Sequence, residues 1–277
     1  MQMKNRLTNG FCLVLLFVRF CAAQGGAIPA VEGGVINAQG LPGQTWTAVG
    51  NLSPIEGGNV YTQSYIEQGA ALLTSPSGHL TVTPYASLGL VLDTKGYKWN
   101  NKIEPRAGMK INCLFREGII SLGTAYSYEN RFRSIESSGL ILYAQDWFGW
   151  QSVASKNSRF PGSTWASIGN TSPVERGDVI AQAYVTQGVI AKRVHKFTVV
   201  PFAESTFSRD SKGFDWDNKA IYGGGVKTTV LRGDVYTEIG AAYREELRFH
   251  SGLRAADLTA FTNFSFGWNL LARRASK

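Results

Sequence analysis

Two acid and base pairs with the same spacing are the residues in this sequence best placed to do chemistry. Glu129 and Arg131 stand two positions apart, and so do Glu246 and Arg248. In a strand, residues two apart point to the same face, so each acid lies beside its base. Such pairs either neutralise each other in an internal ion network or line a basic track that binds an anionic solute. The predicted lumen and solute-binding residues are Arg106, Lys110, Glu129, Arg131, Lys227, Arg244, Glu246 and Arg248.

Catalytic chemistry has less support in the sequence. His79, His195 and His250 are the only histidines, and none lies at an equivalent position in the internal repeat described below. His250-Ser251 resembles the His and Ser pair that lipid-A esterase barrels place in the barrel wall, so a lipid-modifying enzyme is the alternative from another class. The chain has no metal-ligand spacing, phosphate loop or Gly-x-Ser-x-Gly motif, and its basic residues are dispersed. We therefore predict a non-enzymatic protein without cofactor, metal or nucleic-acid partner.

The strongest local motif is Asp-x-Lys-Gly-aromatic-x-Trp-x-Asn-Lys, which begins at Asp93 and again at Asp210. Its carboxylate can cap a tight turn, its glycine can adopt a positive φ, and its tryptophan can anchor the next strand. Calcium binding is the alternative, but one carboxylate among scattered amides lacks the spacing of a calcium loop. We therefore predict a turn at both places.

These motifs belong to an internal repeat that covers nearly the whole chain. Segment 46–54 recurs at 165–173, an offset of 119 positions, and the Asp93 block recurs at an offset of 117. Each copy closes on Phe-Gly-Trp, at Trp150 and at Trp268. Repeats on this scale indicate one structural unit used twice.

Within each copy, apolar residues recur with a period of two. In 80–92 the even positions are apolar and the odd ones are mostly small or polar, which is typical of a strand with one apolar face. The strands expected in the first copy are 44–51, 59–73, 79–93, 98–115, 119–132 and 139–151. Several are longer than an ordinary globular strand and match a tilted membrane strand. Two copies lying the same way across a membrane each need an even number of strands.

The sequence therefore predicts an all-β fold, a single 12-stranded antiparallel outer-membrane β-barrel built from two homologous six-stranded halves. Such a barrel satisfies every backbone polar group in lipid. A periplasmic tandem β-sandwich binding module is the alternative, but no Pro/Ser-rich hinge separates the copies. Loops near 93–99, 130–138, 210–216 and 248–256 are expected outside, and short turns near 75–78, 116–118 and 193–196 inside. The aromatic residues expected at the membrane interfaces are Tyr97, Trp99, Trp147, Trp150, Phe214, Trp216, Phe266 and Trp268.

Composition agrees with a folded, β-rich chain. The 277 residues are 17% charged and 12% aromatic and carry a net charge of +8, which excludes a disordered chain and a charged coiled coil. Residues 1–23 read as a signal peptide with cleavage near Ala23. The further boundaries are a flexible lead-in at 24–43, the first half-barrel at 44–151, a connecting turn at 152–164, the second half-barrel at 165–271 and a basic tail at 272–277.

The paired blocks Gly-Asn-x-Ser-Pro-x-Glu, Asp-x-Lys-Gly-aromatic-x-Trp-x-Asn-Lys and Phe-Gly-Trp are similar to the C-terminal barrel-like domain of proteobacterial phage N4 adsorption proteins and related exopolysaccharide-associated outer-membrane proteins. The resemblance implies a barrel in the cell envelope tied to polysaccharide export. The function expected is a narrow porin, or the barrel component of such a system. Its expected partners are outer-membrane lipid, an anionic oligosaccharide and polysaccharide-export proteins.

Overall fold

Twelve long strands form the structure, a computed structural model that describes residues 40–270 apart from 133, 154 and 233. Two short strands, β3 (Leu73–Thr74) and β10 (Lys192–Val194), and the 3₁₀ turn η1 (Pro54–Glu56) complete the elements. The long strands are β1 (Pro42–Gly50), β2 (Tyr61–Gly69), β4 (Leu80–Asp93), β5 (Lys102–Phe115), β6 (Gly118–Arg131), β7 (Ile135–Trp150), β8 (Gly162–Asn170), β9 (Ile180–Gly188), β11 (Phe197–Asp210), β12 (Lys219–Arg232), β13 (Val235–Arg248) and β14 (Arg254–Asn269).

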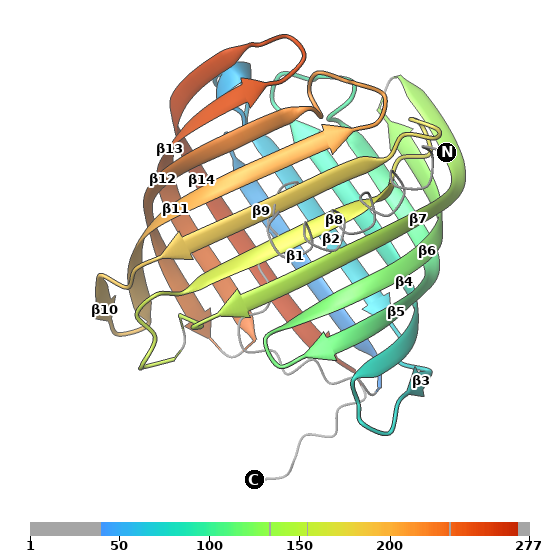
Figure 1. Cartoon of the computed structure of the whole chain (residues 1–277), viewed down its shortest axis with the longest axis horizontal. Helices are drawn as coiled ribbons and strands as arrows, with labels where there is room; N and C mark the ends of the chain where they lie inside the picture. The colour runs from blue at the N-terminus through green and yellow to red at the C-terminus, as the bar shows by residue number, and fades with distance from the viewer. Residues whose placement is uncertain (1–39, 133, 154, 233, 271–277) are drawn as a thin grey trace, which may run out of the picture.

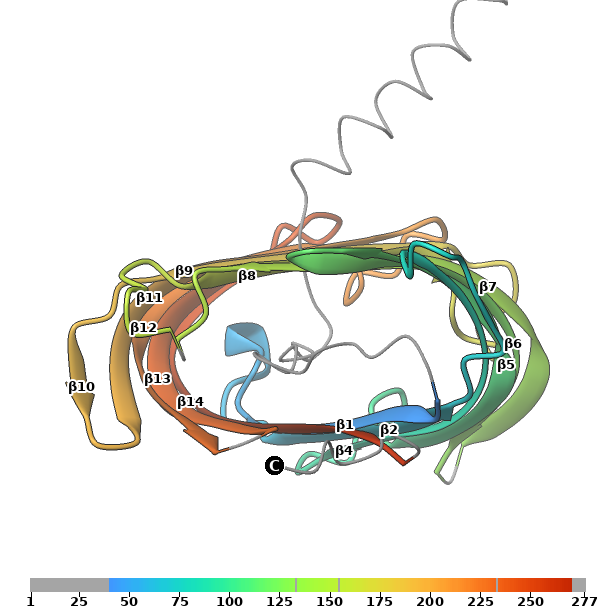
Figure 2. The same ribbon diagram turned by 90° about the horizontal axis from the view of Figure 1, so that it is seen from below.

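The long strands close into one antiparallel barrel (Figures 1 and 2). Each long strand pairs with its neighbours along the chain, and the β14 to β1 pairing closes the ring, with Pro42 opposite Asn269. The short strands β3 and β10 extend β4 and β11 at one rim. The predicted 12-stranded antiparallel barrel is therefore confirmed.

Strand ends differ from the prediction in a few places. The expected strand 59–73 stops at Gly69, because the chain continues into the separate β3 hairpin, and the expected strand 98–115 begins only at Lys102. Strand 139–151 begins earlier, at Ile135, and 152–164 is a turn only up to Gly162, where β8 starts. The predicted signal peptide, most of the lead-in and the basic tail lie outside the described residues.

The barrel is apolar outside and polar inside. On β4, Leu88 and Leu92 are exposed on the outer wall, while Thr81, Thr83 and Tyr85 are buried on the lumen side. Exposed large apolar residues occur in the same way on the other long strands. An apolar outer wall around a polar interior is the pattern of a barrel in lipid, so this chain is a barrel of the outer membrane. Among the described residues, no helix is long and apolar enough to cross a bilayer.

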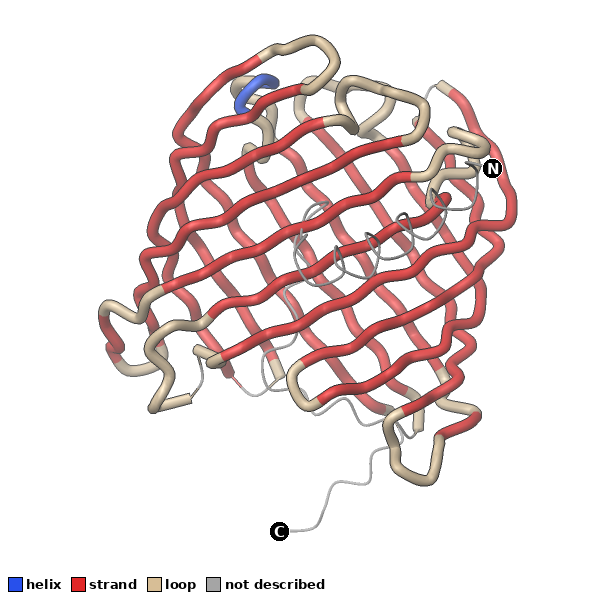
Figure 3. The backbone as a smooth tube through the Cα atoms, viewed as in Figure 1, coloured by secondary structure: helices blue, strands red, loops and turns tan. Residues whose placement is uncertain are grey.

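Figure 3 shows loops at two rims. We call the rim where the described chain begins and ends the inner rim, formed by 70–79, 116–117, 151–153, 155–161, 189–196 and residue 234. The outer mouth is formed by 51–60, 94–101, residues 132 and 134, 171–179, 211–218 and 249–253.

The repeated Asp block forms the predicted turn at the outer mouth. Gly96 and Gly213 both have positive φ, at 68° and 78°. The Asp93 carboxylate accepts a hydrogen bond from the Tyr97 backbone N–H at 3.1 Å, and the Asp210 carboxylate accepts one from Phe214 at 2.9 Å. The carboxylate is thus used to hold the loop, as the turn interpretation requires.

Four of the aromatic residues expected at the lipid interface lie elsewhere. Tyr97, Trp99, Phe214 and Trp216 sit in the outer-mouth loops, where they stack on one another. The prediction of an interface position was wrong for them, because these loops fold toward each other. At the inner end, Trp268 packs against Gly43, where any Cβ would meet its indole at 2.3 Å.

Candidate functional site: the lumen and its outer mouth

All eight predicted site residues take part in side-chain contacts inside the barrel or at its outer mouth. Glu129 and Glu246 are 0% exposed, and Arg244 is 4% exposed. The period-two pattern places them there, because their strands alternate between the lipid face and the lumen. The contacts that they make fall into two clusters, one in each half, and two loop contacts at the mouth.

The first-half cluster centres on Glu67 of β2. The Lys110 ammonium lies 2.6 Å from the Glu67 carboxylate and 5.1 Å from the centroid of the Tyr85 ring. The Tyr65 hydroxyl donates to the same carboxylate at 2.8 Å. The Tyr143 hydroxyl donates to Tyr85 at 2.8 Å, which joins two rings across the lumen side. Lys110 is therefore both paired and packed on an aromatic face.

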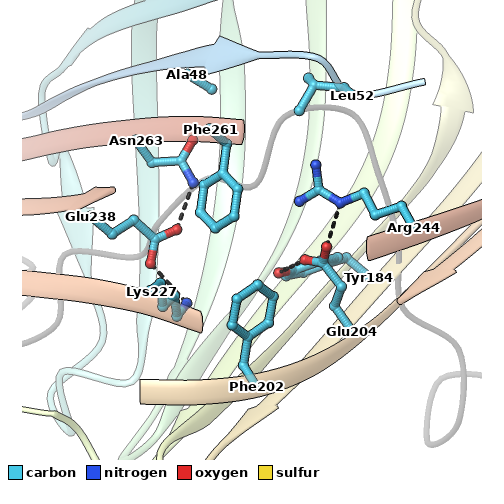
Figure 4. Close-up of a pocket in the computed structure, with 10 residues that line it drawn as sticks. All are labelled: Ala48, Leu52, Tyr184, Phe202, Glu204, Lys227, Glu238, Arg244, Phe261 and Asn263. Atoms are coloured by element: carbon cyan, nitrogen blue, oxygen red, sulfur yellow. Dashed lines mark hydrogen bonds and ion pairs between the residues drawn. The ribbon is translucent and has the colours of Figure 1, made fainter. Parts of the chain in front are cut away.

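The second-half cluster contains two separate ion pairs (Figure 4). The Lys227 ammonium lies 2.7 Å from Glu238, and Arg244 Nε donates to Glu204 at 2.6 Å. Phe202 and Phe261 stand between these pairs with their rings 5.9 Å apart, edge to face. The groups line a small pocket in the lumen wall.

The acids of these clusters were missed by the sequence prediction. Glu67, Glu204 and Glu238 lie on three different strands, and none recurs at the equivalent position of the other copy. Lys110 and Lys227 are equivalent at the offset of 117, but their carboxylate partners come from β2 and β13. Strand alternation could have predicted that Glu67 faces the lumen, since it lies two positions after Tyr65 and therefore on the same face of the strand.

The lumen charges are balanced, so the expectation of a track with excess positive charge needs correction. Seven basic lumen side chains of the described residues each lie within 4.0 Å of a glutamate, including Lys102 with Glu104 and Arg106 with Glu104. The paired bases are Lys102, Arg106, Lys110, Arg131, Lys227, Arg244 and Arg248, and their acids are Glu56, Glu67, Glu104, Glu129, Glu175, Glu204, Glu238 and Glu246. Oppositely charged neighbours cancel the field that an anion track would need.

The first Ser-Pro-x-Glu loop folds inward and binds the wall of the other repeat. Ser53 donates to the buried Glu246 carboxylate, and Glu56 lies 3.1 Å from the Arg248 guanidinium. Arg248 also holds Glu246 through Nε at 3.2 Å. Figure 2 shows η1 of this loop inside the outline of the barrel. The loop therefore covers part of the lumen from the outer mouth.

The second Ser-Pro-x-Glu loop repeats these contacts in the opposite direction. Ser172 donates to Glu129 at 2.5 Å, and Glu175 pairs with Arg131. Arg131 Nε donates to Glu129 at 2.6 Å. We call the Glu56 with Arg248 and Glu175 with Arg131 pairs the two clamps. Each joins one repeat to the other, which gives the Glu-x-Arg pairs and the Ser-Pro-x-Glu motif a common role.

A third contact at the outer mouth joins equivalent loops. Trp99, from the β4–β5 loop, stacks on Trp216, from the β11–β12 loop, with ring centroids 5.8 Å apart and planes at 15°. Tyr97 and Phe214 stack on the outer sides of these rings at 4.8 and 4.9 Å. These loops leave opposite parts of the strand order, so the four-ring stack bridges the mouth.

Two carboxyl groups of the outer-mouth loops have shifted pKa values. Burial raises the pKa of Asp217 to about 6, and the negative charge of Glu175 adds to the shift. Burial would also raise the pKa of Asp215, but hydrogen bonds from the Ser251 N–H and hydroxyl, with the charge of Arg248, bring it below its usual value.

The Ser251 hydroxyl donates to Asp215 at 2.8 Å. Its proton is thus directed at the carboxylate and not at His250, which differs from the nucleophile and base contact that the enzyme alternative requires.

Several buried polar atoms inside the barrel have no hydrogen-bond partner within the described part of the chain. They include the indole N–H groups of Trp46 and Trp165 and the amide oxygens of Asn51 and Asn170, which are equivalent pairs at the offset of 119. Leaving such a group unsatisfied costs about 1–3 kcal/mol. A set of these groups along a lumen suits contact with water or a polar solute.

Comparisons with known proteins identify no family for this chain. No family model matches the sequence, and no curated protein matches it. Among solved structures, the COG4313 outer membrane channel from Pseudomonas putida F1 is 7% identical, with a TM-score of 0.46 over 83% of this chain and 96% of that chain. The beta domain of the Bordetella autotransporter BrkA is 10% identical, with a TM-score of 0.41 over 82% and 98%. A bacterial polysaccharide outer membrane secretin is 11% identical, with a TM-score of 0.40 over 84% and 99%.

These likenesses concern the fold alone, and they agree with the predicted family resemblance only at the level of outer-membrane barrels. None of these three structures is a phage N4 adsorption protein. By its own architecture, a closed ring of twelve long antiparallel strands with an apolar outer wall, the chain is a β-barrel of the outer membrane.

Proposed function

We propose that this protein is a non-enzymatic, narrow channel of the outer membrane that the two clamps hold shut at its outer mouth. The observation that carries the proposal is the pair of reciprocal loop contacts, Glu56 with Arg248 and Glu175 with Arg131. The two clamped loops lie over the lumen at the outer mouth, where breaking the two ion pairs would release them. A channel that opens and closes needs such a two-state element.

The lumen chemistry supports passage of small polar solutes. Within the described residues, buried polar groups such as Trp165 Nε1 and Asn170 Oδ1 have no protein partner, while seven basic side chains of the wall pair with glutamates. A balanced wall gives weak selectivity between anions and cations. The anionic oligosaccharide solute and the polysaccharide-export partner expected from the sequence remain predictions.

Single-channel recording of the refolded chain in planar bilayers tests this function. We expect rare, small conductance steps from the unmodified protein, and frequent steps once Glu56→Gln and Glu175→Gln release the loops. A barrel that inserts but conducts in neither form would overturn the proposal. Insertion is checked separately by heat-modifiable migration on SDS gels, since a closed barrel resists SDS until it is boiled.

A further inference from the structure

Among the described residues, the inner rim carries the largest local excess of positive charge. The described inner rim carries two acids, Glu117 and Asp234. Its basic residues are Arg116, Lys156, Arg159, Lys192, Arg193 and Lys196. The described loops of the outer mouth have a smaller excess. Apart from Glu56 and Glu175, which pair with lumen arginines, they carry the bases Lys95, Lys98, Arg176 and Lys212 and the acids Asp178, Asp215 and Asp217. The inner rim is therefore more positive than either the lumen or the outer mouth in the described part of the chain.

The inner-rim cations differ from those of the lumen in having no acidic partner. Lys156, Arg159, Lys192 and Lys196 are all exposed, and none forms an ion pair with a described residue. Folding therefore does not use these four charges internally. Unpaired surface charge of one sign raises the local concentration of oppositely charged partners and their rate of association.

These four cations are gathered by contacts between two inner-rim segments. The Arg193 guanidinium donates to the backbone carbonyls of Val153 and Ser155, at 2.6 and 2.7 Å. The Ile190 N–H donates to the carbonyl of Arg159 at 2.9 Å. These bonds tie the β9–β11 segment 189–196 to the β7–β8 connection 151–161. Arg193 thus holds the two segments together, while Lys192 and Lys196 on either side of it stay exposed.

The position of the β7–β8 connection argues against membrane lipid as the partner. Val153 is buried against Val200 and Tyr236, which face the lumen. The connection therefore packs against the lumen side of the inner rim and not on the lipid-facing wall. Figure 2, which views the barrel from below, shows it at this rim. Lys156 and Arg159 on it are exposed. Phe160 stands next to Arg159 and is 52% exposed, and an exposed aromatic beside cations is typical of a protein interface.

We propose that this inner-rim surface, formed by Lys156, Arg159, Phe160, Lys192 and Lys196, docks an acidic segment of a soluble periplasmic protein. The charge supplies attraction and orientation, and Phe160 supplies an apolar anchor. Docking here is independent of whether the barrel conducts, because none of the five side chains takes part in the clamps.

The test is binding of a fluorescent peptide of glutamates with two central leucines to the full chain in neutral phosphatidylcholine nanodiscs, followed by anisotropy. We expect binding at about 50 mM salt that weakens at about 300 mM. The variant K156Q/R159Q/K192Q/K196Q should bind at least about tenfold more weakly, with Arg193 left in place to preserve the fold. The matched control K95Q/K98Q/R176Q/K212Q removes the same charge from the outer mouth and should bind like the unmodified barrel.

Absence of peptide binding, or equal weakening in both variants, overturns the proposal. Phe160→Ser should also weaken the peptide. If polygalacturonate binds more tightly than the peptide and Phe160→Ser has no effect, the surface serves an acidic polysaccharide and not a protein. If the peptide binds only when the nanodisc contains anionic lipid, the assignment to these side chains is wrong.

Discussion

The two clamps lead to a quantitative prediction for the variants Glu56→Gln and Glu175→Gln. Glutamine keeps the shape of the side chain but removes the charge that faces the arginine. The Arg248 and Glu56 side chains are only 12% and 11% exposed, so their contact is shielded from water. Arg248 keeps Glu246 as a partner at 3.2 Å, and the substitution therefore leaves no buried charge unpaired on the wall.

The structure sets the expected size of the effect. A hydrogen bond to a charged group contributes about 1.5–3 kcal/mol. If the clamp exists only in the closed state, its loss raises the ratio of open to closed channels by about 10- to 150-fold. The two clamps share no side chain, so the effects of E56Q and E175Q should multiply in the double variant.

The assay is the open probability of single channels in planar bilayers, measured for both single variants and the double variant. Glu245→Gln is the matched control, since Glu245 pairs with Arg254 on the exposed outer surface, where such a pair contributes about 0–1 kcal/mol. It should leave the open probability unchanged. The reasoning is refuted if the double variant opens no more often than Glu245→Gln does.

Three further predictions concern the mouth and the lumen. Burial raises the pKa of Asp217 to about 6, so the ionised carboxylate destabilises the folded mouth at neutral pH. This destabilisation is lost as the pH falls through 6 toward the pKa of an unfolded aspartate, near 4. Asp217→Asn should therefore increase the unfolding free energy near pH 7 but not near pH 4. Glu67→Gln should lower the unfolding free energy by about 2–4 kcal/mol in a denaturant titration, because it leaves the buried Lys110 ammonium without its acid. Trp99→Ala and Trp216→Ala should each lower the unfolding free energy. The loss in the double variant should be about 1 kcal/mol smaller than the sum of the two single losses, since either change removes the same stack. Strictly additive losses would show that the rings do not interact.

Much of the fold could be predicted from local sequence. The period of two in 80–92 predicts both β4 and the face that meets lipid, because alternation follows directly from strand geometry. The predicted internal repeat gives twelve strands from six per copy, and two copies that cross a membrane in the same direction each require an even number of strands. Asp93 and Gly96 predict the turn after β4 in the same local way. These features depend on residues that are near one another along the chain.

The partners inside the barrel could not be predicted in this way. Parity places Lys110 in the lumen, but it does not say that its acid is Glu67, because that depends on which strands neighbour each other and with what stagger. The aromatic residues Trp99 and Trp216 had the composition of an interface girdle, yet their loops turn toward each other.

Sequence by itself thus determined the strands, their faces and the repeated turns of this protein, since each follows from backbone geometry over a few residues. Only the tertiary structure decided that Ser53 meets Glu246 from 193 positions away, and that each repeat is clamped by the other. Closure of the barrel brings β1 beside β14, and this long-range pairing has no signature in the local pattern of either strand. The balance of the lumen charges and the excess at the inner rim follow from the same closure.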